Sequence, residues 1–270
     1  MAESRVRIVR GSGCRVCRLV ASVIEEVLCS AARLGMDVPD EVVVEAYDSP
    51  GMLEPRLELE ARSVGASYAG VRPESCVLYT GWTGLPQVYV VTPLCEGMGE
   101  ARVKGEAVRA AAHSILHRSV ECYVYAVNPY YEATLRMILG PLAPVFLYLV
   151  GAGVRGYEAN SLAVRLDYGG YVAVDEEAAL REAVAALEKP SLRVSRLLMT
   201  AEIFKYFAEA KPLTGIRPGI IELLQRVTVL YPIESRAAAK ALASLDAGRS
   251  TAERARAAAE SIIAEILAHA

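Results

Sequence analysis

Two of the three histidines in this 270-residue chain are four residues apart, a spacing that could place two metal ligands on one helix. His113 and His117 belong to VKGEAVRAAAHSILHRSVECY (103–123), whose composition predicts a helix. Side chains at i and i+4 lie above one another on a helical face, so both imidazoles could offer a nitrogen to one ion. A hydrogen-bonded pair of core histidines has the same spacing, since a metal also needs a third ligand and an open position.

A second stretch, YEANSLAV (157–164), can be read together with HSILH (113–117). Together they resemble the gluzincin-type zinc metallopeptidases, in which a helix carrying HExxHxxLH is followed by a helix resembling YEADxxAV. The resemblance covers about residues 75–170 and implies an α+β, zincin-like fold. In that fold a small mixed sheet packs on the active-site-type helix and a helical C-terminal part follows. It also implies that Glu158 supplies a third ligand, with Asn160 where aspartate is common.

The resemblance can be aligned in two registers. In the first register, His117 is the trailing histidine and His113 the second ligand, so Arg109 stands at the first ligand and Ala110 at the catalytic glutamate. In the second register, HSILH is itself the motif, both imidazoles survive, and Ser114 replaces the glutamate. The first register is favoured because it also accounts for Leu116 and for the preceding helical turn.

Either register removes the group that the peptidase reaction needs. In the family, zinc turns bound water into a nucleophile, and the glutamate takes up its proton and passes it on. Neither alanine nor serine can act as that base near neutral pH. The resemblance therefore implies a catalytically inactive, pseudo-gluzincin protein with a structural or peptide-binding role and no cofactor. Its remnant site would be Arg109, Ala110, His113 and Glu158.

Arg109 is the residue expected to replace the metal in this remnant site. Its guanidinium would lie one turn before His113 and could satisfy a buried Glu158 carboxylate, although it could also reach solvent or Glu106. The alternative interpretation is a metal-dependent hydrolase or peptidase that binds zinc through His113, His117 and Glu158 and uses an unusual base. A third interpretation is a helical interaction protein whose likeness to the family is accidental.

Hydrophobic periodicity gives the elements that must position these residues. An apolar stripe at helical spacing predicts a helix over 16–31, and β-branched or aromatic runs predict strands at 41–47, 56–62, 76–81 and 86–93. Nearly everything after residue 103 predicts helix, in the segments 103–126, 130–139, 142–153, 156–167, 175–188, 191–209, 216–230, 233–245 and 249–268. This order indicates an α+β chain with a zincin-like domain at 1–188 and a helical region at 189–270.

QVYVV (87–91) is expected to be an edge strand next to the histidine helix, where a peptide or protein partner could add a strand. The formal net charge of −3 and the absence of a dense basic run argue against nucleic acid as a partner. The chain opens without a signal-peptide pattern, so a cytoplasmic protein is expected, and homo-oligomer formation is left open.

An 18-residue uncharged stretch (137–154) challenges the expectation of no membrane contact, since its length is at the lower edge for a membrane span. Two prolines interrupt it, which favours a kinked, buried helix. Arginine far outnumbers lysine, and Asn and Gln are scarce, an archaeal-type composition that fits a thermophile.

In such a thermophile, disulfides are an option for the six cysteines, with the pairing open. Cys14 and Cys17 form a CxxC on the first helix. With no second pair, they are interpreted as core thiols or disulfide partners rather than as a redox or metal centre.

Overall fold

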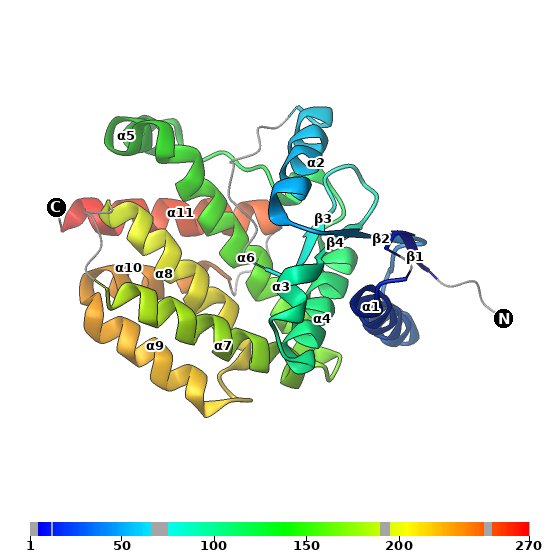
Figure 1. Ribbon diagram of the computed structural model, residues 1–270. Coiled ribbons are helices and arrows are strands. Elements are labelled where there is room, and N and C mark those ends of the chain that lie inside the picture. Colours follow the sequence, from blue (N-terminus) through cyan, green and yellow to red (C-terminus); the bar gives the residue numbers. More distant parts are fainter. Residues whose placement is uncertain (1–4, 12, 66–74, 190–194, 246–249, 270) are drawn as a thin grey trace. The chain divides into compact units, whose positions relative to one another are not determined.

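The computed structural model describes residues 5–11, 13–65, 75–189, 195–245 and 250–269. Its contacts divide the chain into two units (Figure 1). Unit 1 contains residues 1–120 and 159–175, and unit 2 contains residues 121–158 and 176–270. The chain therefore passes from one unit to the other within two of its helices, a different division from the single boundary expected after residue 188.

Unit 1 is built on a four-stranded mixed sheet of order β1-β2-β4-β3. Its strands and helices are β1 (Val6–Arg10), α1 (Arg15–Arg33), β2 (Val42–Tyr47), α2 (Pro50–Ser63), β3 (Val77–Thr80), β4 (Gln87–Val91), α3 (Thr92–Glu96) and α4 (Glu100–Leu116). The end of α6 (Ala143–Arg165) and the start of α7 (Gly169–Leu187) also belong to it. β1, β2 and β4 run parallel, and β3 is antiparallel to β4. The predicted small mixed sheet is confirmed.

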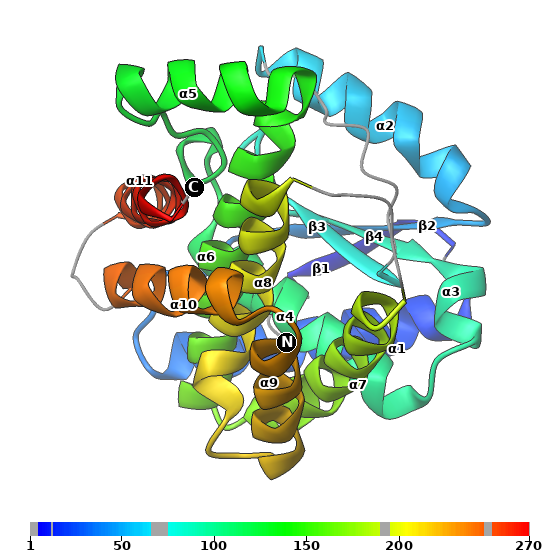
Figure 2. The same ribbon diagram turned by 90° about the vertical axis from the view of Figure 1, so that its left-hand side faces the viewer.

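The two faces of the sheet carry different helices. Figure 2 shows α2 over one face and α1 with α4 over the other. Under α2, Tyr47, Leu53, Leu57, Tyr89 and Val91 form a buried apolar cluster. On the opposite face, α1 packs closely along α4. Helix α4 is therefore held by both the sheet and α1, which fixes the direction in which its side chains point.

Two strand predictions are wrong. Residues 56–62 lie in α2, where Leu53, Leu57 and Ala61 are buried at a spacing of four, the period of a helix rather than of a strand. Residues 87–91 do form a strand, but β4 lies between β2 and β3 and is not an edge. All five of its residues are buried, as is typical of an interior strand. The edge strand beside α4 is β3.

Unit 2 is helical, which confirms the predicted helical C-terminal part. It contains α5 (Pro129–Leu139), most of α6, most of α7, α8 (Arg196–Ala210), α9 (Pro218–Leu230), α10 (Pro232–Ala241) and α11 (Thr251–Ala268), with 3-10 turns η1 (Val120–Cys122) at its border and η2 (Gly140–Leu142), η3 (Lys211–Leu213) and η4 (Leu242–Leu245) within it. Helix α8 is its centre, since α9, α10 and α11 all pack against it.

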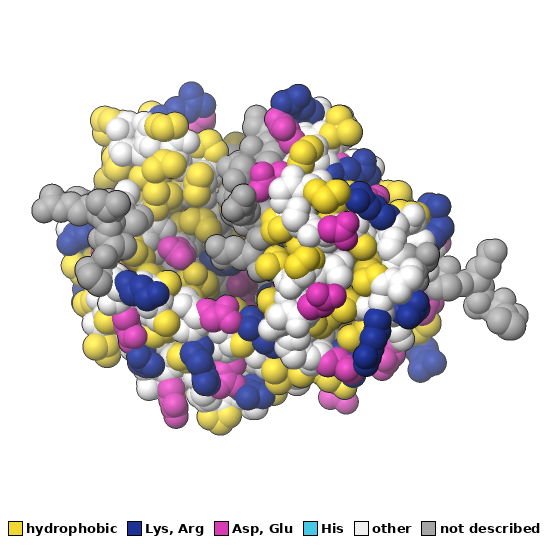
Figure 3. Space-filling model, in the orientation of Figure 1, with side chains coloured by type: hydrophobic (Ala, Val, Ile, Leu, Met, Phe, Trp, Pro, Cys, Tyr) yellow, Lys and Arg dark blue, Asp and Glu magenta, His cyan; other side chains and the backbone are white. Residues whose placement is uncertain are grey.

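The uncharged stretch 137–154 is divided in the structure, because η2 separates α5 from α6. By length and composition alone, Pro129–Arg165 contains an 18-residue stretch that is apolar enough to cross a membrane, and 39% of that stretch is buried. Apolar side chains gather on the outer surface of α5, where Tyr130 and Met137 are largely exposed (Figure 3). The core helix of a soluble protein passes the same test, so the cytoplasmic location stays a prediction.

A close approach of α4 to α7 generates the first testable prediction. A Cβ atom added at Gly105 would lie 2.5 Å from the carbonyl oxygen of Tyr171 and 2.8 Å from Cβ of Asp175. Gly105→Ala should therefore lower the free energy of unfolding by about 1–3 kcal/mol, the usual cost of overpacking. Denaturant unfolding of the variant measures this change.

The matched control is Gly170→Ala in α7, where an added Cβ meets nothing within 4 Å. This substitution should leave stability unchanged or raise it slightly, because alanine is the better helix former. Equal stability of the two variants would contradict the close packing of α4 on α7.

Candidate functional site

The two histidines meet at the C-terminal end of α4. His113 lies in the last turn, and His117 follows the helix with φ −123° and ψ 54°, its N–H donating to the carbonyl oxygen of His113 at 2.8 Å. The His117 side chain is fully buried, and that of His113 is partly buried. Both residues are thus positioned by one helix end, as the sequence predicted, although His117 is already outside the helix.

The two imidazole rings bind each other. Their Nδ1 atoms are 2.8 Å apart, so one ring donates an N–H and the other accepts it. Two nitrogens that share one tetrahedral zinc lie about 3.3 Å apart, given zinc–nitrogen distances near 2.0–2.1 Å. The observed distance is that of a hydrogen bond. A hydrogen-bonded pair was one of the two interpretations that the spacing allowed.

Strand β3 is joined to this end of α4. The ring of Tyr79 stacks on that of His113, with centroids 5.5 Å apart and planes 10° apart, and its hydroxyl donates to the carbonyl oxygen of His117 at 2.9 Å. Just after β3, a Cβ added at Gly81 would lie 2.4 Å from the same carbonyl oxygen. Only glycine allows the backbone to pass this close, so Gly81 and Tyr79 together hold the edge strand against the histidine pair.

Arg109 has a different carboxylate partner from the one expected. Its Nη2 lies 3.2 Å from Oδ2 of Asp175, and Nε of Arg102 lies 3.5 Å from Oδ1 of the same residue. Asp175 is almost completely buried, so it is held between two guanidinium groups. Within unit 1 the carboxylate partner of Arg109 is thus Asp175, and the pairing with Glu158 stays a prediction. The physical reason is that α7 brings a carboxylate onto α4, a contact that the helical pattern did not show.

Glu158 lies in unit 2 and forms its ion pair there. Its carboxylate contacts the guanidinium of Arg254 and accepts a hydrogen bond from the Thr251 hydroxyl at 2.9 Å. Of the remaining predicted residues, Ala110 is buried in α4 and has nothing to titrate. Within the described part of the chain, no group of three or more His, Cys, Asp or Glu side chains is arranged to hold a metal ion.

Glu106 contributes to this site in a way that its position in the sequence did not predict. It is buried one turn before Arg109, and its Oε2 accepts a hydrogen bond from the N–H of Val77 in β3 at 2.6 Å. Burial, followed by the nearby Asp175 carboxylate, raises the pKa of Glu106 to about 7. One sequence feature could have indicated this buried charge. Arg102, Glu106 and Arg109 alternate in sign along one helical face, beside buried alanine and valine.

A second polar group lies on the opposite face of the sheet, under α2. The Tyr89 hydroxyl donates to the buried Glu60 carboxylate, and Thr80 donates to the same carboxylate at 2.9 Å. Arg56 reaches Glu60 at 3.4 Å and Oε1 of Gln87 at 2.9 Å. Burial and then the bond to Glu60 raise the pKa of Tyr89. Each of these groups is used to fix α2 on the sheet, so we assign the cluster a structural role.

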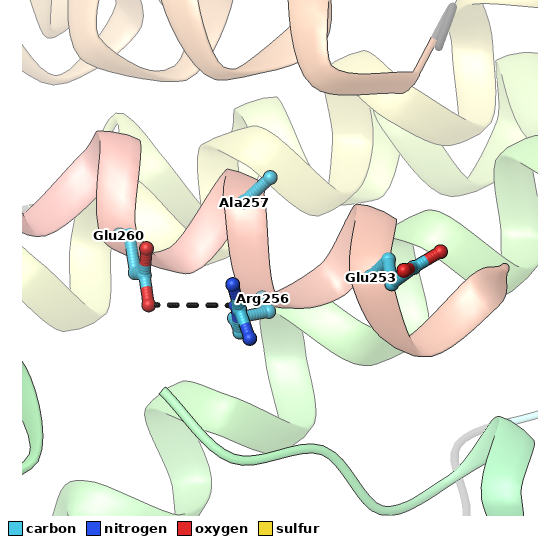
Figure 4. A pocket seen from close by; sticks show the side chains of 4 residues that line it. All are labelled: Glu253, Arg256, Ala257 and Glu260. Atoms are coloured by element: carbon cyan, nitrogen blue, oxygen red, sulfur yellow. Dashed lines mark ion pairs between the residues drawn. The ribbon is translucent and has the colours of Figure 1, made fainter. Parts of the chain in front are cut away.

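A hollow on the surface of α11 is shown in Figure 4. It is lined by Glu253, Arg256, Ala257 and Glu260. Arg256 and Glu260 form an ion pair at 3.7 Å, and Glu253 caps the start of the helix with Ser250. Glu260 also accepts a hydrogen bond from the N–H of Asn128 at 2.8 Å. These contacts are structural, so we assign the hollow no chemistry of its own.

The raised pKa of Glu106 generates a prediction about stability and pH. A carboxyl group whose pKa rises from 4.5 to about 7 on folding binds its proton more tightly in the folded state. The contribution of Glu106 to the free energy of unfolding therefore falls as pH increases from about 4.5 to 7 and is constant above that range, a loss of about 3 kcal/mol. Glu106→Gln should remove this loss while keeping an acceptor for the Val77 N–H. Urea unfolding between pH 4.5 and 8 measures it.

The control is Glu58→Gln in α2. The Glu58 carboxylate is exposed, and its ion pair in the described part of the chain is with Arg62. That variant should follow the wild-type pH profile. A Glu106→Gln variant whose stability relative to wild type does not change with pH would show that Glu106 ionises normally in the folded chain.

Comparisons with known proteins add no family to this geometry. No family model matches the sequence, no curated protein matches it, and no solved structure matches the fold. The function must therefore be argued from the contacts of the site residues themselves.

Proposed function

We propose that the chain is a non-catalytic, metallopeptidase-like protein whose zincin-like part binds peptides or protein segments. The observation that carries the proposal is the buried ion pair between Arg109 and Asp175. In the first register of the resemblance, Arg109 occupies the position of a zinc ligand. Buried Ala110 occupies the position of the catalytic glutamate. A guanidinium can neither bind zinc nor take up a proton from water, so this position contributes charge compensation rather than catalysis.

The competing hydrolase interpretation, with zinc on His113, His117 and Glu158, is supported less well. The two imidazoles are hydrogen-bonded to each other, and Glu158 is ion-paired with Arg254. Ser114, the residue in place of the base, is buried and donates its hydroxyl hydrogen to the carbonyl oxygen of Ala110 at 2.9 Å. A zinc site would have to break each of these contacts first.

The peptide-binding part of the proposal rests on the direction of the backbone groups in β3. The N–H of Val91 donates to the carbonyl oxygen of Cys76 at 2.8 Å, which makes Cys76 and Val91 a hydrogen-bonded pair. In an antiparallel ladder such pairs alternate, so the N–H and C=O groups of Val77 and Tyr79 point away from β4. Glu106 already binds the first of these N–H groups. The proposal places the added strand along the Tyr79 end of β3, beside the histidine pair.

The proposal predicts that the purified chain, supplied with zinc, does not cleave casein or a mixture of short peptides. General acid–base groups contribute typically about 10²–10⁴-fold in rate, and the two positions aligned with the catalytic glutamate hold a buried alanine, Ala110, and a buried serine, Ser114. Cleavage that a chelator blocks, that His113→Ala abolishes and that His269→Ala leaves intact would establish the hydrolase instead. The last variant controls for zinc binding at an unrelated histidine, at the end of α11.

The binding half is tested with a random-peptide phage library selected on the full-length chain. Bound peptides should lose affinity at least about tenfold for Tyr79→Pro, which removes a backbone donor, compared with Tyr79→Ala, which keeps it. Both variants lose the ring stacked on His113, so they differ in the backbone alone. Thermal unfolding confirms that both are folded. Failure to select any peptide, or equal affinity of the two variants, would contradict strand addition at β3.

A further inference from the structure

The cysteine pair at the start of α1 has a setting that the sequence alone did not show. Strand β1 was not predicted, and it places Cys14 and Cys17 where a strand turns into a helix within a β1-α1-β2 unit. The N–H of Cys14 donates to the carbonyl oxygen of Gly11 at 2.8 Å, which closes the turn. Cys14 is the N-cap residue of α1, and Cys17 lies in the first turn. The helix start thus holds both sulfurs on one side.

The two thiols have different environments. Sγ of Cys14 is half-buried and accepts a hydrogen bond from the N–H of Cys17 at 3.2 Å. Cys17 is fully buried, and burial, followed by its hydrogen bond to Cys14, raises the pKa of the Cys17 thiol to about 12. The Cys14 sulfur is thus partly accessible to a reactant, whereas the Cys17 sulfur is buried and linked to Cys14 by a hydrogen bond.

We propose that Cys14 and Cys17 are a redox dithiol that reduces disulfides, with Cys14 as the attacking sulfur and Cys17 as the resolving sulfur. The Cys14 thiolate attacks one sulfur of the substrate, forms a mixed disulfide and releases the other half as a thiolate. Cys17 then gives up its proton to solvent and attacks Sγ of Cys14. The Cys14–Cys17 disulfide forms, and the second half leaves as a thiolate. Two electrons pass from the dithiol to the substrate, which balances the exchange.

Charge around Cys14 indicates the class of disulfide. Arg15 and Arg18 are exposed on the first turn of α1, and a guanidinium nitrogen of Arg18 donates to the carbonyl oxygen of Gly13 at 3.3 Å. Among the described residues, the first turn of α1 carries no acidic side chain. Positive charge beside the attacking sulfur raises the local concentration of anions, so the substrate is a disulfide flanked by carboxylates.

The other cysteines allow a clean test. Cys76 and Cys95 already form a buried disulfide. Cys29 and Cys122 are the other two cysteines outside the disulfide, so Cys29→Ser and Cys122→Ser provide a background in which Cys14 and Cys17 are the remaining thiols. The probe is Ellman's reagent, an anionic aromatic disulfide whose thiolate product is coloured.

In this background the full-length reduced chain should release two equivalents of coloured thiolate and end with Cys14 linked to Cys17, as shown by peptide mass mapping. Adding Cys17→Ser should give one equivalent and a lasting mixed disulfide on Cys14. Adding Cys14→Ser instead should slow the release about 100-fold or more, because Cys17 is buried. Thermal unfolding establishes that each variant is folded.

Loss of the mixed disulfide in the folded Cys17→Ser variant would overturn the assignment, as would a wild-type pair that stays reduced after excess oxidised glutathione. For the substrate class, oxidised glutathione should react about tenfold faster than the cationic disulfide cystamine at low salt, and Arg15→Gln with Arg18→Gln should remove the difference. Equal rates for oxidised glutathione and cystamine with the chain that keeps Arg15 and Arg18 would contradict the preference for anionic substrates. Reduction of insulin alone, with neither small disulfide reacting, would assign the dithiol to protein substrates instead.

Discussion

The buried carboxylate of Asp175 is the group on which the arrangement of unit 1 depends. It lies between the guanidinium groups of Arg102 and Arg109, and so connects α7 to α4. A carboxylate in such a place would be strongly unfavourable without a charged partner, and removing one partner of a buried pair typically costs about 3–5 kcal/mol. Glu106, on the same face of α4, extends the network to β3 by accepting the Val77 N–H. Two helices and the edge of the sheet are therefore fixed by four charged side chains.

This network also decides what the histidine end of α4 can do. With Arg109 committed to Asp175, the helix presents a hydrogen-bonded histidine pair rather than a set of converging ligands. The ring of Tyr79 covers His113, and its hydroxyl holds the carbonyl oxygen of His117, so the edge strand is fixed at the same place. The charges and hydrogen bonds of the region are used within unit 1. A rigid surface without a reactive group is better suited to binding than to catalysis.

Much of the fold could be predicted because the periodicity of buried side chains is a local property. The helix expected at 16–31 is α1, and the strands expected at 41–47, 76–81 and 86–93 are β2, β3 and β4. Among the strands, the local pattern failed in two places. RLELEAR alternates like a strand, yet it lies in α2, where the decisive contacts are made by Leu53 and Leu57 from outside or at the start of that run. In VRIVR, arginines interrupt the apolar residues because β1 is an edge strand with exposed positions.

Only the part of the site that lies on a single helix, α4, could be predicted from the sequence. The placement of Arg109, Ala110 and His113 on α4 follows from their spacing, and so does the contact between the two histidines. The partners from distant segments did not follow, since a sequence with many buried acids does not show which of them meets a given arginine. Asp175 and Glu158 were equally plausible partners for Arg109 by charge. Asp175 is brought to Arg109 by the start of α7, which belongs to the same unit as α4.

A double-mutant cycle on Arg109 tests this choice most directly. The free energy of unfolding is measured for Arg109→Met, Asp175→Asn and the double variant, and in parallel for Arg109→Met, Glu158→Gln and their double variant. The account predicts a coupling energy of about 2 kcal/mol for Arg109 with Asp175, within the range for contacting residues, and a coupling near zero for Arg109 with Glu158. Strong coupling to Glu158 together with none to Asp175 would contradict it.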